Sequence, residues 1–196
     1  MNIFSKICNW FMATSTWIQA LTWFVASQIV YFTMLFVTIP AIQNKANGMK
    51  IFDLMTTGYS PQYVTSFLEA IGETGRKLYL TNQMPLDLIY PSLMAITGAL
   101  FIALFSKKIN HRLGVILFIP IFGAIFDYFE NIMVAVMLLS FPNIPKPIAM
   151  FASLFTVLKT ILDTLYLVLL VVLFVLFLYK IVRGKRKVEG GSPNSK

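Results

Sequence analysis

Charged residues and cysteine are scarce in this sequence, and their scarcity excludes several kinds of protein. Only 12% of the residues are charged, whereas a soluble domain typically carries about 25%. The single cysteine, Cys8, excludes an intrachain disulfide and a cysteine-based metal site. The single histidine, His111, and the absence of a His-Glu-x-x-His motif argue against zinc and di-iron sites. We therefore expect no metal and no cofactor.

Long apolar runs dominate the chain instead. Apolar residues make up 58% of the sequence, and the mean hydropathy is +0.76. A run of roughly 18 or more apolar residues is long enough to cross a bilayer as an α-helix. Only helices and closed barrels satisfy their backbone polar groups in lipid, and the alternating pattern of a barrel strand is absent. The sequence therefore predicts an all-α polytopic membrane protein.

Four such runs predict a four-transmembrane-helix bundle in one membrane-embedded domain over residues 1–183. The predicted spans cover about 17–39, 86–105, 113–139 and 148–181. We expect the first span to stop at Pro40, because proline lacks the N–H that continues a helix. The remaining residues, 184–196, are basic and polar, and they predict a disordered tail.

The distribution of basic residues predicts which ends of these helices face the cytoplasm. Ten lysines and arginines fall on the side of both termini and five on the other side, and cytoplasmic loops carry the excess. We therefore expect a multi-pass protein of the cell membrane with both termini in the cytoplasm. The basic cluster after the last span suits anionic lipid headgroups, so membrane lipids are expected partners and nucleic acid is not. The sequence leaves open whether the protein forms a homo-oligomer.

The predicted outer loop between the first two spans, about 41–85, is too long for a simple connector. Ser60 and Pro61 have the pattern of an N-cap and a first helical residue, and Gly72 has that of a C-terminal stop. Apolar side chains recur between them at helical spacing: Tyr63, Phe67, Leu68 and Ile71. We expect a short amphipathic helix on the outer membrane surface, where it would act as a lid.

Ionisable residues inside the third and fourth spans are the strongest sign of function, because each costs about 2.5–3.5 kcal/mol to insert. Asp127, Glu130 and Asn131 share one helix face, and Gly123 on that face allows close approach of a neighbour. The fourth span carries a matching stripe at similar depth: Thr156, Lys159, Asp163 and Tyr166. We predict that the two stripes face each other and that Lys159 pairs with Glu130 or Asp127.

Three carboxylates beside one lysine would leave excess negative charge in a medium of low dielectric constant. Protonation of one acid, a bound cation, or Arg76 reaching in from the loop would relieve the excess. Asp87 and Tyr90 are candidates for the rim, although Asp87 fits equally well as an N-cap. The candidate ligand-binding residues are Asp87, Tyr90, Asp127, Glu130, Asn131, Thr156, Lys159, Asp163 and Arg76. The candidate catalytic residues are Asp127, Glu130, Lys159 and Asp163.

These features favour a binding protein whose buried pocket opens toward the outer leaflet and holds a lipid or an amphiphilic small molecule. In this interpretation Lys159 anchors a negative or carbonyl group of the ligand. An enzyme that performs acid–base chemistry on a lipophilic substrate would use the same cluster. Three further hypotheses are proton-coupled transport, an assembly subunit of a membrane complex, and a polar cluster that only fixes the packing of the helices. The sequence alone leaves open whether the protein is an enzyme.

Overall fold

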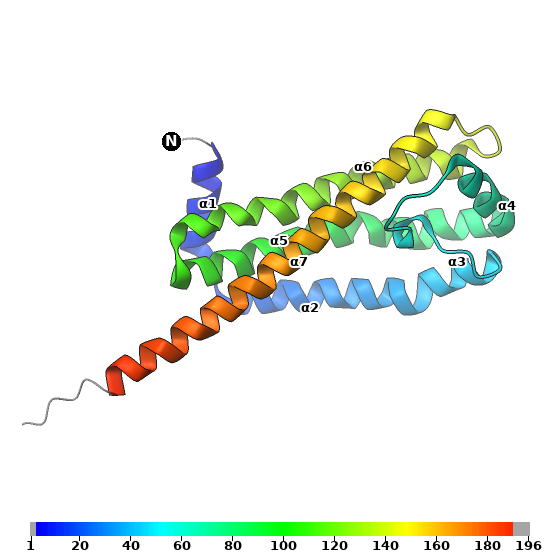
Figure 1. Cartoon of the computed structure of the whole chain (residues 1–196). Coiled ribbons are helices and arrows are strands. Elements are labelled where there is room, and N and C mark those ends of the chain that lie inside the picture. The colour runs from blue at the N-terminus through cyan, green and yellow to red at the C-terminus, as the bar shows by residue number, and fades with distance from the viewer. Residues whose placement is uncertain (1–2, 190–196) are drawn as a thin grey trace, which may run out of the picture.

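The computed structural model describes residues 3–189, with side chains as far as Arg183, and every regular element among them is helical. Four stretches are long and apolar enough to cross a membrane: Trp17–Lys45, Pro61–Ile109, His111–Ser140 and Lys146–Arg183. They run up and down, so that helix α1 (Ile3–Thr14) and the far end of the last helix lie at the same end of the bundle (Figure 1). The predicted four-helix membrane protein is confirmed.

The first span passes through Pro40 instead of stopping there. Its elements are α2 (Trp17–Thr33), the π-helical turn η1 (Met34–Thr38) and α3 (Ile39–Lys45). Ile39 donates its backbone N–H to Met34 five residues back, and Pro40 falls in the first turn of α3. A helix tolerates proline in its first turn, and a wide turn just before it absorbs the change in hydrogen bonding. The predicted end at residue 39 was therefore wrong.

The second span begins earlier than the predicted residue 86. Helix α4 (Pro61–Leu78) continues through the π-helical turn η3 (Tyr79–Gln83) into α5 (Met84–Ile109). The helical geometry breaks once, at Gly72, whose φ of 63° is in the left-handed region that favours glycine. The predicted stop at Gly72 is thus confirmed, but the chain resumes a helix directly after it.

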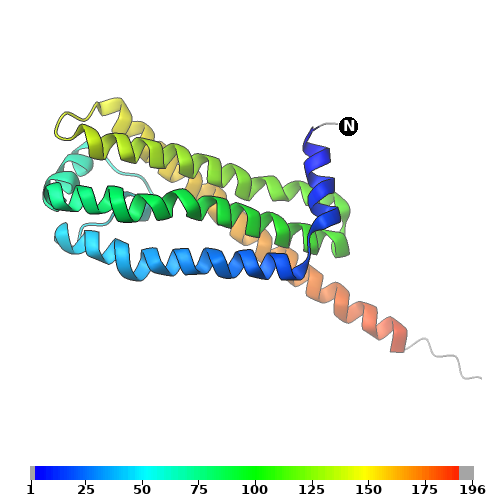
Figure 2. The same ribbon diagram turned by 180° about the vertical axis from the view of Figure 1, so that it is seen from behind.

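The apolar face of α4 covers one end of the bundle, which we call the capped end (Figure 2). Ser60 caps the helix, since its Oγ accepts a hydrogen bond from the Tyr63 N–H at 3.1 Å. Phe67, Leu68 and Ile71 are almost fully buried, in a core that includes side chains from α6 and α7. The predicted apolar face is confirmed. The expectation that this apolar face lies against the membrane was wrong, because protein covers it.

The last two spans have the most extensive contact of any helix pair in the described bundle. The 3₁₀ helix η4 (His111–Leu117) leads into α6 (Phe118–Ser140), and α7 (Lys146–Glu189) returns along it. Toward its far end α7 leaves the bundle, so that Val175 and Tyr179 are exposed. Helix α7 also extends past residue 184, where we expected the tail to begin; the rest of that predicted tail, 190–196, lies outside the described residues.

The interior divides into two halves along the bundle axis. At the capped end, α4 and the loop containing the 3₁₀ helix η2 (Phe52–Leu54) close over a core that includes Phe52, Phe67 and Tyr79. At the opposite end, which we call the tail end, α5, α7 and η4 enclose a second core that includes Ile102, Phe105 and Leu173. Helix α1 crosses this tail end at a steep angle to the spans (Figure 1).

Candidate functional site

A lysine ammonium lies among three carboxylates inside the capped half. Lys159 Nζ is 2.8 Å from Asp53 Oδ1, 3.3 Å from Asp127 Oδ1 and 2.5 Å from Glu130 Oε2. The Glu130 side chain is fully buried, and that of Lys159 is 9% exposed. The predictions that the polar stripes of the third and fourth spans face each other, and that Lys159 pairs with Glu130 or Asp127, are confirmed. We call these four residues the ion cluster.

Asp53 is the member of the ion cluster that the sequence did not reveal. It lies in η2, and its other carboxylate oxygen accepts a hydrogen bond from the Tyr79 hydroxyl at 3.1 Å. Burial alone would raise the pKa of Asp53, but the Lys159 ammonium and these hydrogen bonds hold it below its ordinary value. A single aspartate in a loop carries no periodic signal, and only the fold brings it to Lys159.

Hydrogen bonds fix the acids of the cluster in place. Thr156 donates from Oγ1 to Glu130 Oε1 at 2.6 Å. Asn131 donates from Nδ2 to Asp127 Oδ1 at 3.1 Å and to the Asp87 backbone oxygen at 2.9 Å. Asn131 thereby ties α6 to α5, and Thr156 ties α7 to α6. Both residues hold the carboxylates at a set height in the bundle.

Asp87 is buried inside continuous helix, so the N-cap interpretation of this residue was wrong. Its Oδ1 accepts a hydrogen bond from Gln83 Nε2 at 2.8 Å, and Gln83 is itself hydrogen-bonded to Thr38. Asp87 Oδ2 has no hydrogen-bond partner among the described residues. The polar network therefore extends from the ion cluster across α5 to the first span, but leaves one buried carboxylate oxygen unpaired.

Arg76 does not reach the ion cluster. Its guanidinium donates to the backbone oxygen of Leu68 at 2.9 Å and lies 4.4 Å from the centre of the Phe141 ring. It thus secures the end of α4 to the loop after α6. The hypothesis that Arg76 relieves the negative charge of the site was wrong, because these contacts hold it elsewhere.

The three carboxylates of the ion cluster have the spacing of a metal site. One oxygen from each of Asp53, Asp127 and Glu130 lies within 4.8 Å of the others. The position between them, however, is taken by Lys159 Nζ, which contacts all three. The ammonium is thus the cation that these acids hold, and full ionisation would leave the cluster with an excess of negative charge.

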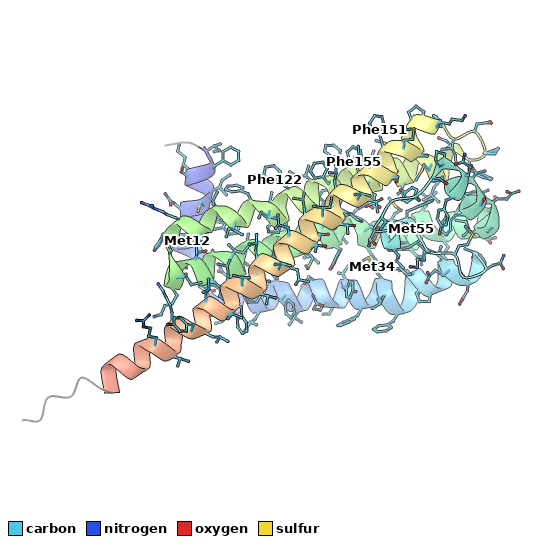
Figure 3. The ribbon with its side chains drawn as sticks, in the orientation of Figure 1. Met12, Met34, Met55, Phe122, Phe151 and Phe155 are labelled. Atoms are coloured by element: carbon cyan, nitrogen blue, oxygen red, sulfur yellow. The ribbon has the colours of Figure 1, made fainter. Side chains whose placement is uncertain are left out.

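Two cavities adjoin the ion cluster. The larger, about 260 Å³, lies between the first span and α7, and the residues that line it include the ionisable side chains Asp53, Asp87 and Lys159. Met34 lines this cavity, and Figure 3 shows Met34 and Met55 below α7 in that view. The smaller, about 190 Å³, lies between α5, α6 and α7, and its walls are largely apolar. Both cavities share three lining residues: Tyr90, Asp127 and Asp163.

Fold and site together define a helical, multi-pass membrane protein with a buried acid–lysine cluster beside two adjoining cavities. In comparisons with protein-family models, curated proteins and solved structures, nothing matches this chain. Its function must therefore be argued from the chemistry of the site.

Proposed function

We propose that this protein binds an amphiphilic molecule from the membrane, with the polar group in the larger cavity and the apolar part in the smaller one. The observation that supports this proposal is the common wall of the two cavities, formed by Tyr90, Asp127 and Asp163. One side of that wall carries carboxylates and an ammonium. The other side carries Met94, Pro120 and further apolar side chains. A molecule with one polar and one apolar end matches this division.

The depth of the site supports entry of the ligand from the bilayer. Lys159 lies thirteen residues along α7 from Lys146, which corresponds to roughly 20 Å of helix at 1.5 Å per residue. The larger cavity has walls from both α2 and α7, while α2 packs chiefly on α5. A ligand dissolved in the membrane would therefore enter between α2 and α7. With the termini in the cytoplasm, as the basic residues favour, this entrance lies in the outer leaflet.

The role of Lys159 in this proposal differs from that of a ligand anchor. Its ammonium already has three carboxylate partners at 2.5–3.3 Å, so little of its charge is left for a ligand. We assign it the role of holding Asp53, Asp127 and Glu130 together. The ligand-binding groups are then the wall residues outside this arrangement, above all Asp87, Asp163 and Tyr90.

The proposal is tested by filling the apolar cavity. Ala124 lines the smaller cavity, so Ala124→Leu places three further carbon atoms in it without altering any charge. The matched control is Ala13→Leu, the same substitution at an exposed position of α1. The measurement is native mass spectrometry of each purified protein released from detergent. We expect a co-purifying amphiphile on the wild type and on the control, and its loss or marked reduction in Ala124→Leu. A wild type without any bound mass, or equal occupancy in all three proteins, would contradict the proposal.

A further inference from the structure

The walls of the two cavities are strongly unbalanced in charge. Their acidic residues are Asp53, Asp87, Asp127 and Asp163, whereas Lys159 is their only basic residue among the described part of the chain. That one ammonium is already held by Asp53, Asp127 and Glu130. The remaining acids face the cavities without a cation of their own, and a ligand that supplied a positive charge would restore the balance.

Asp87 gives independent evidence that a hydrogen-bond donor is missing. The residue is 6% exposed and lines the larger cavity, yet its Oδ2 has no hydrogen-bond partner among the described residues. A buried polar atom left without a partner costs about 1–3 kcal/mol, and more when it is charged. Such atoms are rare in folded proteins, and each calls for an explanation. A donor placed in the cavity would satisfy this oxygen.

Asp163 and two tyrosines also line the larger cavity in which such a donor would lie. Asp163 lines both cavities and makes no hydrogen bond or ion pair with any described residue. Tyr31 and Tyr90 also line the larger cavity, and their rings stack with centres 5.8 Å apart. An ammonium group gains from carboxylates and from the faces of aromatic rings alike. An anionic group in the same place would be repelled by the acids.

We propose that the polar group of the ligand is a protonated amine that retains an N–H, bound by Asp87 and Asp163 beside Tyr90. The inference rests on the proposed function, since it names the head group of the amphiphile that the two cavities hold. A phosphate next to the amine would meet the acidic wall, so we expect an amine without a neighbouring anion. A quaternary ammonium would carry the charge but could not donate a hydrogen bond to Asp87 Oδ2.

The test uses amphiphiles that share one alkyl chain and differ in the head group: dodecylamine, dodecanol, dodecanoate and dodecyltrimethylammonium. Each is titrated into phosphatidylcholine nanodiscs that contain the full chain, and the rise in the melting temperature gives an apparent affinity. We expect dodecylamine to bind about tenfold more tightly than dodecanol, which corresponds to about 1.4 kcal/mol. Dodecyltrimethylammonium should bind less tightly than dodecylamine, and dodecanoate least of all.

Two variants identify the carboxylates that recognise the amine. Asp163→Asn and Asp87→Asn should each abolish the preference for dodecylamine over dodecanol. Asp163 makes no hydrogen bond or ion pair within the described chain, so its substitution is not expected to disturb folding. Glu73→Gln, which removes an equal charge from an exposed position on α4, is the control for membrane surface charge.

The outcomes separate the two proposals. If dodecanol stabilises the protein as strongly as dodecylamine does, the amine assignment fails and the binding of amphiphiles stands. If no amphiphile stabilises the wild type, both fail. A preference for dodecylamine that survives in Asp163→Asn and in Asp87→Asn would also overturn the amine site. Equal binding of dodecyltrimethylammonium and dodecylamine would overturn the requirement for an N–H.

Discussion

The capped half and the tail half of the bundle are built from the same four spans but differ in what they enclose. In the capped half, α4 and the η2 loop bring Asp53 to a lysine and two further acids from α6 and α7. In the tail half, no charged side chain of the described residues is buried; the core is apolar apart from hydroxyls such as those of Ser106 and Tyr166, and η4 and α1 close it. Among the described residues, the buried charges are thus confined to the half that α4 and the η2 loop cover.

This difference shows how a bundle in a membrane can hold charge at depth. Lipid cannot solvate an ion pair, so each charged group needs partners from the protein itself. The spans provide Asp127, Glu130 and Lys159, and the loop adds the third carboxylate, which also accepts a hydrogen bond from Tyr79 of η3. The tail half holds no buried charged side chain among the described residues, and there α7 diverges from its neighbours (Figure 1).

The largest expected effect comes from removing the lysine. Lys159→Met leaves three carboxylates without their cation, and Glu130 is fully buried. Breaking a buried ion pair on one side typically costs about 3–5 kcal/mol, and we expect a loss of this size. In the tail half, Leu173→Met at a position that is 3% exposed should cost less than about 1.5 kcal/mol. The measurement is the free energy of unfolding in mixed micelles.

Neutralising two of the acids shows whether Lys159→Met loses stability through unbalanced charge or through poorer packing. Lys159→Met combined with Asp127→Asn and Glu130→Gln removes two of the three uncompensated acids. The triple variant should therefore recover much of the lost stability, because an isolated buried charge costs more than a neutral polar group. If the triple variant is less stable than Lys159→Met alone, the ion cluster is not held together by the charge balance that we infer.

A smaller effect compares two glycines at which neighbouring helices approach closely. A Cβ at Gly98 would lie 2.8 Å from the ring of Tyr166, whereas a Cβ at Gly123 would lie 2.8 Å from Asp163 Oδ1. A ring packed in the core cannot move aside easily, but a carboxylate beside two cavities can rotate away. We expect Gly98→Ala to cost about 1–3 kcal/mol and Gly123→Ala clearly less. Thermal unfolding of both variants in detergent checks the order, and the reverse order would show that Asp163 is rigidly held.

Much of the site followed from the sequence because helical periodicity fixes which residues share a face. The spacing of Asp127, Glu130 and Asn131, and of Thr156 and Lys159, was enough to predict two facing stripes at one height. The predicted close approach of a neighbouring helix at Gly123 is also confirmed, since Asp163 of α7 lies against this glycine of α6. These features depend on regular helices of known rise, and the four spans provide them.

The parts that the sequence did not reveal depend on irregular backbone. Asp53 lies in a loop whose path is set by the packing of Phe52 against Phe67 and Tyr79, and no local pattern encodes that path. The first span continues through Pro40 because a π-helical turn precedes it, and such turns have no sequence signature strong enough to predict. Arg76 was assigned to the site from its charge alone, but the break at Gly72 and the Phe141 ring determine where it lies.

The smallest effect that we predict concerns the carboxylate that comes from the loop. Asp53→Asn keeps an oxygen that can accept from Lys159 and removes one charge from an acidic cluster, so we expect a loss of only about 1 kcal/mol at neutral pH. The folded-state pKa of Asp53 lies below its ordinary value of 3.8, because the Lys159 ammonium and the hydrogen bonds to the carboxylate together outweigh the effect of burial. Its charge therefore stabilises the fold above that value, and the contribution is lost as the pH falls through the lowered pKa. The difference in melting temperature between wild type and Asp53→Asn should accordingly be present at pH 7 and should shrink only in strong acid. A difference that vanishes already near pH 6 would mean that the Asp53 carboxylate is not stabilised in its charged form, and that the loop does not act as the third partner of Lys159.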